Sequence, residues 1–231
     1  MDFSKIKHGL IVSCQSEGND PFNTPEGVTL FAKAAVMGGA VAIRSQGFEK
    51  TMMITEQVSV PVIGLMKSEF LDGTVRITGS FEEVEQLIKT GCSMIAIDGT
   101  FREREGMTGP AFISAVKAKY NIPVMADVAE YQEGIACAEA GADCISTTLS
   151  GYTPSTSHYS HTEPDYELIE RLTISLGIPI IAEGRINVPE YAAKAIEKGA
   201  YAVVVGTAIS RPRVVTSWFA EAIQSATQTR G

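Results

Sequence analysis

Short apolar segments rich in β-branched residues recur along this chain and alternate with longer segments that have helical spacing. Eight apolar segments of this kind cover residues 9–14, 40–44, 61–67, 93–98, 123–127, 144–148, 179–183 and 202–206. Most of them are continuous apolar runs, which is typical of parallel strands that are covered on both faces. Eight strands that alternate with helices predict an α/β fold, namely one (β/α)8 barrel of the TIM-barrel type.

The residues that precede the predicted strands are of two alternating kinds. The even-numbered strands follow glycines that suit the left-handed end of a helix, at Gly38-Gly39, Gly91, Gly141 and Gly199. Three odd-numbered strands begin at a proline that follows Val or Ile, at Pro61, Pro123 and Pro179. Such a regular repeat favours the barrel over the alternative, an open doubly wound sheet.

The length of the chain agrees with one barrel and with no second domain. The chain has 231 residues, which is within the usual range for this fold. Because eight strand–helix units use nearly all of that length, we expect a single domain over residues 1–231. The hydrophobic share of 45% and the charged share of 20% indicate a globular chain with a large core.

Several classes of function are disfavoured by charge and composition. With 19 basic and 27 acidic residues, the net charge is −8, so binding nucleic acid by phosphate neutralisation has no electrostatic basis. The longest apolar stretch, residues 34–43, is too short to cross a membrane, and no signal peptide is apparent. The four cysteines form no CxxC pair, and His158 and His161 lie in a polar loop. We therefore expect a cytoplasmic protein without a metal site.

Polar side chains follow most of the predicted strands at their carboxyl ends, where barrel enzymes carry their active sites. These positions are Gln15, Arg44, Lys67, Asp98, Asp127, Thr148, Glu183 and Thr207. A ring of such residues predicts a binding or catalytic site at one end of the barrel. The alternative is an ion-pair network that only stabilises the rim.

The ends of the last two predicted strands favour a phosphorylated ligand. Gly184 and Gly206 allow phosphate oxygens to approach backbone N–H groups closely. A helix that begins near Thr207 adds a favourable dipole, and Arg185 or Arg211 can supply charge-assisted hydrogen bonds. The sequence has neither a GxxxxGK[ST] loop nor a GxGxxG motif after a strand, so nucleotide sites are unsupported.

Several of these segments together resemble the N-acetylmannosamine-6-phosphate 2-epimerase family of bacterial sialic-acid catabolism. The resemblance extends from Gly9 to about Phe219, and its most specific stretches are Ser-Gly-Tyr-Thr at 150–153 and Ala-Glu-Gly-Arg-Ile at 182–186. It implies a cofactor-free interconversion of N-acetylmannosamine 6-phosphate and N-acetylglucosamine 6-phosphate. The chain departs from the family pattern at residues 45–47 and 99–105.

The resemblance also implies roles for particular residues. Lys67 is expected to be the acid/base residue, with Glu183 as its essential carboxylate partner. The residues expected to hold the sugar are Gln15, Arg44, Asp127 and Thr148. Those expected to hold the phosphate are Gly184, Arg185, Gly206, Thr207 and Arg211.

These residue types suit inversion at C2 of an N-acyl amino sugar. The C2 proton becomes acidic only when C1 is a free aldehyde, so the ring must open before an enolate can form. A nearby cation such as Arg44 would help a lysine to act as a base. Glu183 would assist ring opening or fix Lys67 through a shared hydrogen bond. Proton return by one residue and relay through a substrate hydroxyl both remain open.

Two other functions and one assembly remain possible. Lys67 could form a Schiff base in a sugar-phosphate lyase or aldolase, or the barrel could be a non-catalytic sugar-phosphate sensor. The last helical segment carries Val214, Val215, Trp218, Phe219 and Ile223. We expect Trp218 and Phe219 to pack against the barrel or a partner subunit, so a homodimer is possible.

Overall fold

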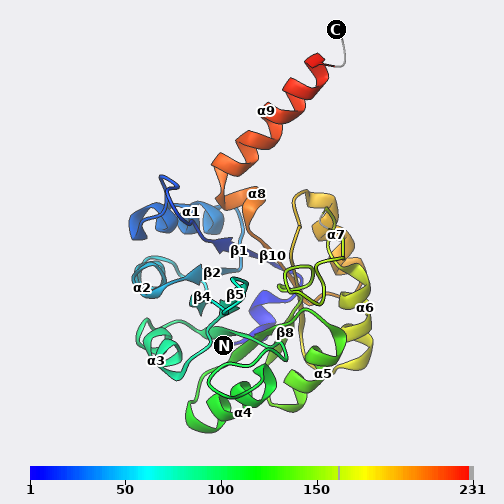
Figure 1. The fold of residues 1–231 in the computed structure, drawn as a ribbon. Helices are drawn as coiled ribbons and strands as arrows, with labels where there is room; N and C mark the ends of the chain where they lie inside the picture. Colours follow the sequence, from blue (N-terminus) through cyan, green and yellow to red (C-terminus); the bar gives the residue numbers. More distant parts are fainter. Residues whose placement is uncertain (161, 229–231) are drawn as a thin grey trace.

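The computed structural model describes residues 1–160 and 162–228, in which eight parallel strands form a closed barrel inside a layer of helices (Figure 1). The barrel strands are β1 (Leu10–Cys14), β2 (Ala42–Gln46), β3 (Val62–Leu65), β6 (Met94–Asp98), β7 (Val124–Asp127), β8 (Cys144–Ser146), β9 (Ile180–Glu183) and β10 (Ala202–Val205). The first and last of these strands pair, with Ile11 opposite Val204, and this pairing closes the ring. The predicted (β/α)8 barrel is confirmed, and the open sheet is excluded.

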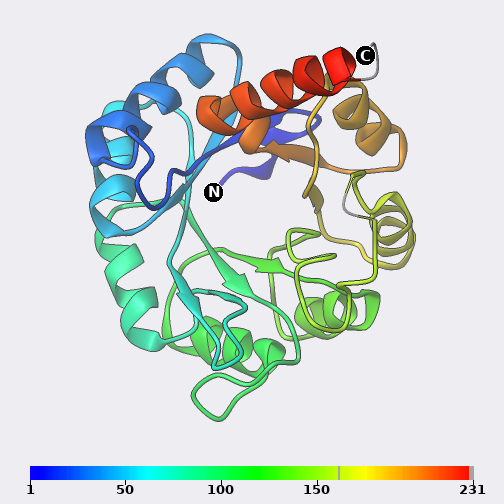
Figure 2. The same ribbon diagram turned by 45° about the horizontal axis from the view of Figure 1, so that its top comes forward.

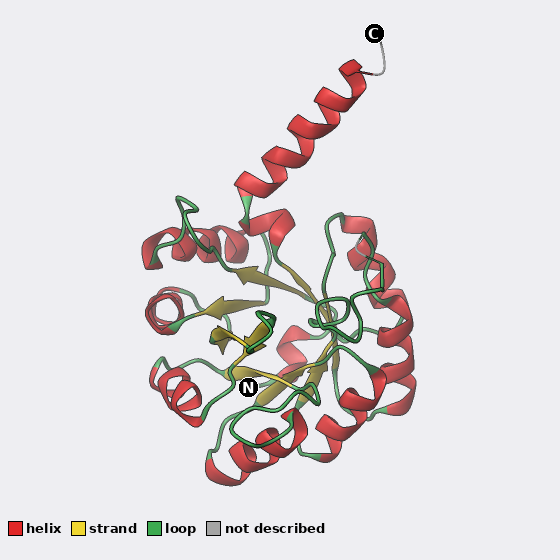
Figure 3. Ribbon diagram, viewed as in Figure 1, coloured by secondary structure: helices red, strands yellow, loops and turns green. Residues whose placement is uncertain are grey.

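Helices surround the barrel strands, as Figures 2 and 3 show from two directions. They are α1 (Pro25–Met37), α2 (Phe48–Gln57), α3 (Phe81–Lys89), α4 (Gly109–Lys119), α5 (Tyr131–Glu139), α6 (Tyr166–Ser175), α7 (Pro189–Glu197), α8 (Thr207–Ser210) and α9 (Pro212–Gln228). Local sequence sets several of their ends. Ser80 and Glu83 form a reciprocal capping box that begins α3, and the predicted cap glycines Gly39, Gly91, Gly141 and Gly199 all have positive φ.

Buried apolar side chains fill the barrel interior, where Ile11, Ile63, Met125 and Val204 pack together. Ile6, from a short 3-10 helix at Phe3–Ile6, packs against the same cluster and closes the amino-terminal end of the barrel. A second apolar layer lies between the strands and the outer helices. The carboxyl ends of the strands are therefore the open end of the barrel.

A β-hairpin follows the third barrel strand and was not predicted. It consists of β4 (Lys67–Glu69) and β5 (Val75–Ile77), which pair antiparallel with Lys67 opposite Ile77. The strand predicted over residues 61–67 therefore ends at Leu65, and Lys67 begins the hairpin instead. The base of the hairpin is closed where the Met66 N–H donates to the Thr78 hydroxyl at 3.1 Å.

The last helix, α9, extends away from the barrel (Figure 1), and none of its residues is buried. Trp218 and Phe219 are 38% and 68% exposed, so of the two expected alternatives, packing against their own barrel is excluded. A helix packs onto a barrel only where its apolar face contacts an apolar surface of the barrel. Helix α9 extends away from the barrel directly after α8, so its apolar face makes no such contact. In the described part of the chain, no helix has the length and apolar character needed to span a bilayer.

Candidate active site

A cavity of about 540 Å³ opens at the carboxyl ends of the barrel strands. That volume is typical of sites for small molecules. Its walls include ten of the predicted site residues, namely Gln15, Arg44, Lys67, Thr148, Glu183, Gly184, Arg185, Gly206, Thr207 and Arg211. Asp98 and Asp127 are the exceptions, because both are fully buried, and Asp127 lies behind Arg44. The strand ends thus converge on one place, as the barrel topology predicts.

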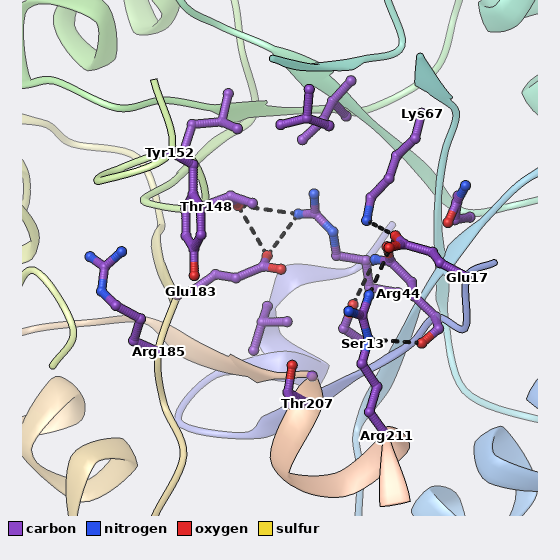
Figure 4. Close-up of a pocket in the computed structure, with 18 of the residues that line it drawn as sticks. Ser13, Glu17, Arg44, Lys67, Thr148, Tyr152, Glu183, Arg185, Thr207 and Arg211 are labelled. Carbon is purple, nitrogen blue, oxygen red and sulfur yellow. Dashed lines mark hydrogen bonds and ion pairs between the residues drawn. The ribbon is translucent and has the colours of Figure 1, made fainter. Parts of the chain in front are cut away.

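One side of the cavity is a buried network centred on Arg44, which comes from β2 (Figure 4). The guanidinium contacts both carboxylate oxygens of Asp127, at 2.9 and 2.5 Å, in the planar two-point geometry that arginine favours. Its Nη1 also lies 2.9 Å from Glu183 Oε2. Burial alone would lower the pKa of Arg44, but Asp127 and Glu183 raise it, so Arg44 remains a cation.

Thr148 connects the two carboxylates of this network. Its hydroxyl lies 2.8 Å from Asp127 Oδ1 and 3.0 Å from Glu183 Oε2. A hydroxyl has one proton, so it can donate to only one of the two carboxylates at a time. Burial raises the pKa of Glu183 more than the Arg44 guanidinium lowers it, and Asp127 contributes to the increase. Glu183 is therefore the carboxyl in this group best suited to gain and lose a proton.

The opposite side of the cavity carries a more exposed group of Lys67, Glu17 and Arg211 (Figure 4). A single oxygen, Glu17 Oε1, contacts Lys67 Nζ and lies 3.3 Å from Arg211 Nη2. Partial burial acts to raise the pKa of Glu17, but these two cations lower it overall. In the described part of the chain, Lys67 donates to Glu17 and makes no hydrogen bond with Glu183, so the expected shared hydrogen bond is not observed. Arg44, expected as a cation that assists Lys67, has its charge matched by two carboxylates.

The predicted phosphate loops lie next to each other at the ends of β9 and β10. Gly184 and Arg185 both have positive φ, of 109° and 57°, which turns the chain sharply after Glu183. The Arg185 guanidinium donates to the carbonyls of Glu163 and Ser150, each at 2.7 Å. It therefore stabilises the loop over the site, while the Arg185 side chain still lines the cavity.

The second loop places Gly206 and Thr207 at the beginning of α8, which has only four residues. The Ser210 hydroxyl donates to the carbonyl of Ser13 at 2.7 Å and joins this loop to β1. Arg211 follows directly, and its Nε lies 3.3 Å from the carbonyl of Gln15. This loop thus places backbone N–H groups and the Arg211 side chain beside each other, where they can bind an anion.

Several residues that line the cavity were not predicted as site residues from the sequence. They are Ser13, Glu17, Gln46, Ser68, Glu69, Gly73, Tyr152 and Asn187. Tyr152 lies within the motif at 150–153, and Asn187 directly follows the motif at 182–186. Their closeness in sequence to the predicted site residues could therefore have identified them. Glu17 gave no such signal, because it lies in a loop 50 positions from Lys67. The buried Oε1 of Gln46 makes no hydrogen bond within the described residues.

No group of three or more His, Cys, Asp and Glu residues is placed to hold a metal ion within residues 1–160 and 162–228. The ring of His158 stacks edge-on against Tyr159 in the polar loop, and His161 lies outside the described residues. All four cysteines are buried and unpaired, and burial raises the pKa of Cys14 to about 12. The cysteines are therefore small core residues, as predicted.

Comparison with known proteins gives matches over nearly the whole chain. The profile of a family described as "Putative N-acetylmannosamine-6-phosphate epimerase" matches residues 28–225. A relative from Caldanaerobacter subterraneus subsp. tengcongensis, named "Putative N-acetylmannosamine-6-phosphate 2-epimerase", is 50% identical over 217 residues, which cover 93% of this chain and 91% of the relative. A relative of the same name from Clostridioides difficile is 44% identical over 220 residues, covering 95% and 98%.

A solved structure gives the same result for the fold. The N-acetylmannosamine-6-phosphate 2-epimerase from Clostridium perfringens superposes with a TM-score of 0.88 at 41% identity, and the match covers 95% of each chain. The barrel, the convergence of the strand-end residues and these matches agree with one another. The chain belongs to the N-acetylmannosamine-6-phosphate epimerase family, a family of isomerases.

Proposed function

We propose that this protein interconverts N-acetylmannosamine 6-phosphate and N-acetylglucosamine 6-phosphate by removing and returning the C2 proton, without a cofactor. The observation that carries this proposal is the placement of Lys67 and Glu183 on different walls of one cavity (Figure 4). Two proton-transfer groups that border one substrate site are what inversion of a carbon next to a carbonyl requires. The names of the relatives supply the substrate class.

In this proposal Lys67 transfers the C2 proton and Glu183 assists ring opening. The raised pKa of Glu183 suits a carboxyl that must accept and donate a proton near neutral pH. Arg44 and protonated Lys67 line the same cavity and would stabilise the negative charge that develops on the enolate. Gln15 and Thr148 hold the sugar, and Asp127 acts indirectly by fixing Arg44.

The phosphate is assigned to Gly184, Gly206, Thr207 and Arg211. Of the two predicted arginines, Arg211 is the better phosphate ligand, because its partner Glu17 is half exposed and replaceable. Arg185 donates to two backbone carbonyls, so we assign it mainly to holding the loop. Binding energy from the phosphate, which is remote from C2, positions the reacting carbon.

Turnover in D2O tests the proposal directly. Starting from N-acetylmannosamine 6-phosphate, deuterium is expected at C2 of the product, and Lys67→Ala is expected to abolish turnover without loss of the fold. Lys198→Ala is the matched control, because Lys198 forms an ion pair with Glu170 on the outer helices. A fully active Lys67→Ala variant would refute the assignment. Borohydride trapping of substrate on Lys67 would instead support a Schiff-base lyase, and binding without turnover would support a sensor.

We further propose that the protein is a homodimer that acts in the cytoplasm. The partly buried Val215 and the exposed residues Trp218, Phe219 and Ile223 recur at helical spacing along one face of α9. A second copy of the chain would cover this face, and the buried, unpaired thiols suit a reducing compartment. Sedimentation of the wild-type chain is expected to give twice the chain mass, and Phe219→Asp with Ile223→Asp the single mass. A wild-type monomer would contradict the dimer.

A further inference from the structure

The β4–β5 hairpin carries Lys67 but is not part of the barrel sheet. It lies within the ring of barrel strands in Figure 1, and its residues Lys67, Glu69, Gly73 and Val75 line the cavity. A two-stranded hairpin is marginally stable in water unless something packs against it. Its turn is exposed at Leu71 and Gly73, so the position of Lys67 depends on contacts made beside the turn.

A rigid loop after β6 lies next to this hairpin. Asp98, at the end of β6, is fully buried, and Arg104 donates to its backbone carbonyl and to its Oδ1, both at 2.9 Å. The buried carboxylate of Glu133 accepts the Phe101 N–H at 3.1 Å and so anchors the same loop to α5. With these buried contacts, the loop is a fixed support at the open end of the barrel.

Arg102 joins the fixed loop to the hairpin. On the loop side, its Nη2 lies 2.9 Å from Asp98 Oδ2 and its Nε lies 3.0 Å from the Thr100 hydroxyl. On the hairpin side, its Nη1 donates to the Thr74 hydroxyl at 2.8 Å, and its guanidinium lies 4.2 Å from the centre of the Phe70 ring. Every nitrogen of this guanidinium thus has a partner, and the planar group connects the β6 loop to the hairpin. The Arg104 guanidinium of the same loop also lies 5.8 Å from the centre of the Phe70 ring, but it makes no hydrogen bond to the hairpin.

We propose that Arg102 is a positioning residue, which holds the β4–β5 hairpin against the β6 loop and thereby places Lys67 for proton transfer. This inference rests on the proposed function of Lys67. Arg102 lines no part of the cavity, so it acts on the reaction only through the hairpin. A displacement of about 1 Å in a reacting group can lower a rate by about 100-fold, so a loosened hairpin is expected to affect kcat more than KM.

The test compares Arg102→Met with the wild-type chain in two measurements. The kcat for N-acetylmannosamine 6-phosphate is expected to fall by about 10- to 100-fold, with KM changed by less than about threefold. Hydrogen exchange of the hairpin amides, such as the Phe70 N–H that bonds the Thr74 carbonyl at 2.9 Å, is expected to become faster. Arg171→Met is the matched control, because Arg171 on α6 also has its guanidinium over an aromatic ring, 4.5 Å from the centre of the Tyr131 ring on α5, and pairs with Glu167. None of these partners belongs to the hairpin.

Thr74→Val is the second variant, because it removes the hydroxyl that accepts from Arg102 and donates to Asp72 within the turn, and it leaves the contacts of Asp98 intact. The same changes are expected at smaller size, about two- to fivefold in kcat. Wild-type kcat in both variants would overturn the proposal, whatever happens to exchange, and so would unchanged exchange with reduced kcat. A wild-type chain without turnover would refute the proposed function instead, and hairpin exchange in Arg102→Met would then still decide whether Arg102 holds the hairpin.

Discussion

Two groups of charged residues border the same cavity and differ in their surroundings. In the buried group, Arg44 and Asp127 are 1% and 0% exposed and meet through two hydrogen bonds. In the rim group, Lys67 and Glu17 are 26% and 44% exposed, and Arg211 contacts the same Glu17 oxygen. Both groups combine arginine and carboxylate side chains, so the type of residue does not explain the difference.

This difference in exposure indicates which charged side chains can leave their present partners to bind a ligand. Removing one partner of a buried ion pair leaves an uncompensated charge away from water, which is strongly unfavourable. Separating a half-exposed pair costs little, because water and the ligand replace the lost partner. We therefore expect the buried group to be a rigid wall of the site. The rim group is expected to exchange its Glu17 contacts for contacts with an anionic substrate.

The largest effect is expected from Arg44→Met. This substitution leaves the fully buried Asp127 beside the partly buried Glu183 without a cation, so the free energy of unfolding should fall by about 3–5 kcal/mol. Turnover should be lost as well. Urea denaturation measures the stability, and Arg211→Met, which is expected to lose less than about 1 kcal/mol, is the control from the rim group. Equal losses in the two variants would remove the distinction between the groups.

Glu183→Gln is expected to abolish turnover while increasing stability at neutral pH. The pKa of Glu183 is raised from 4.5 in the folded chain, so its favourable contribution exists below that value and is lost as the pH rises through the folded pKa. Glutamine cannot ionise at this position. The free energy of unfolding of the variant relative to wild type should therefore increase by roughly 1.4 kcal/mol for each pH unit between 4.5 and the raised pKa of the folded chain.

Urea denaturation between pH 4 and pH 8 measures this difference. Glu190→Gln, at an exposed carboxylate on α7, is the control and should show no such dependence. A constant difference between Glu183→Gln and wild type over the whole range would mean that burial does not affect the ionisation of Glu183.

Arg211→Met is expected to weaken substrate binding more than it affects the chemical step. A charge-assisted hydrogen bond contributes about 1.5–3 kcal/mol, so KM should rise by about 10- to 100-fold with kcat nearly unchanged. Steady-state kinetics with N-acetylmannosamine 6-phosphate measure both constants. Arg213→Met is the matched control two residues away, because Arg213 contacts the exposed Asn19 side chain outside the cavity. If KM is unchanged in Arg211→Met, then Arg211 does not hold the phosphate.

The smallest effect is expected from Glu17→Gln. This change removes the charge that occupies Lys67 and Arg211, so the substrate no longer competes with a resident carboxylate. Half-exposed ion pairs contribute about 0.2–1 kcal/mol, so KM should fall by about two- to fivefold. Inhibition by inorganic phosphate should become stronger by a similar factor. A higher KM would show that Glu17 contacts the substrate itself and is not its competitor.

Much of the fold follows from local sequence signals. Helix α3 is an example, because the capping residues that begin it, Ser80 and Glu83, lie at its own amino-terminal end in the chain. The β-rich runs predict the barrel strands because each run must be covered on both faces. The β4–β5 hairpin was missed, since the apolar run 61–66 continues past the end of β3 and conceals where that strand stops.

The candidate site was predictable as a set of residues but not as a set of contacts. Barrel topology alone brings ten of the twelve predicted residues to one cavity. Asp127 was expected to hold the sugar, but the long Arg44 side chain separates it from the cavity. That arrangement depends on how the side chains of β2, β7 and β9 fill the barrel end, which no local pattern encodes.

The sequence by itself determined the barrel, its open end and the residues that would gather there, because these follow from periodicity and strand order. Only the tertiary structure decided which charge meets which. Lys67 pairs with Glu17 and Arg44 with Asp127, across separations of 50 and 83 positions. The free energy of such a pair depends on burial and on distances of a few ångströms, and both are properties of the assembled barrel.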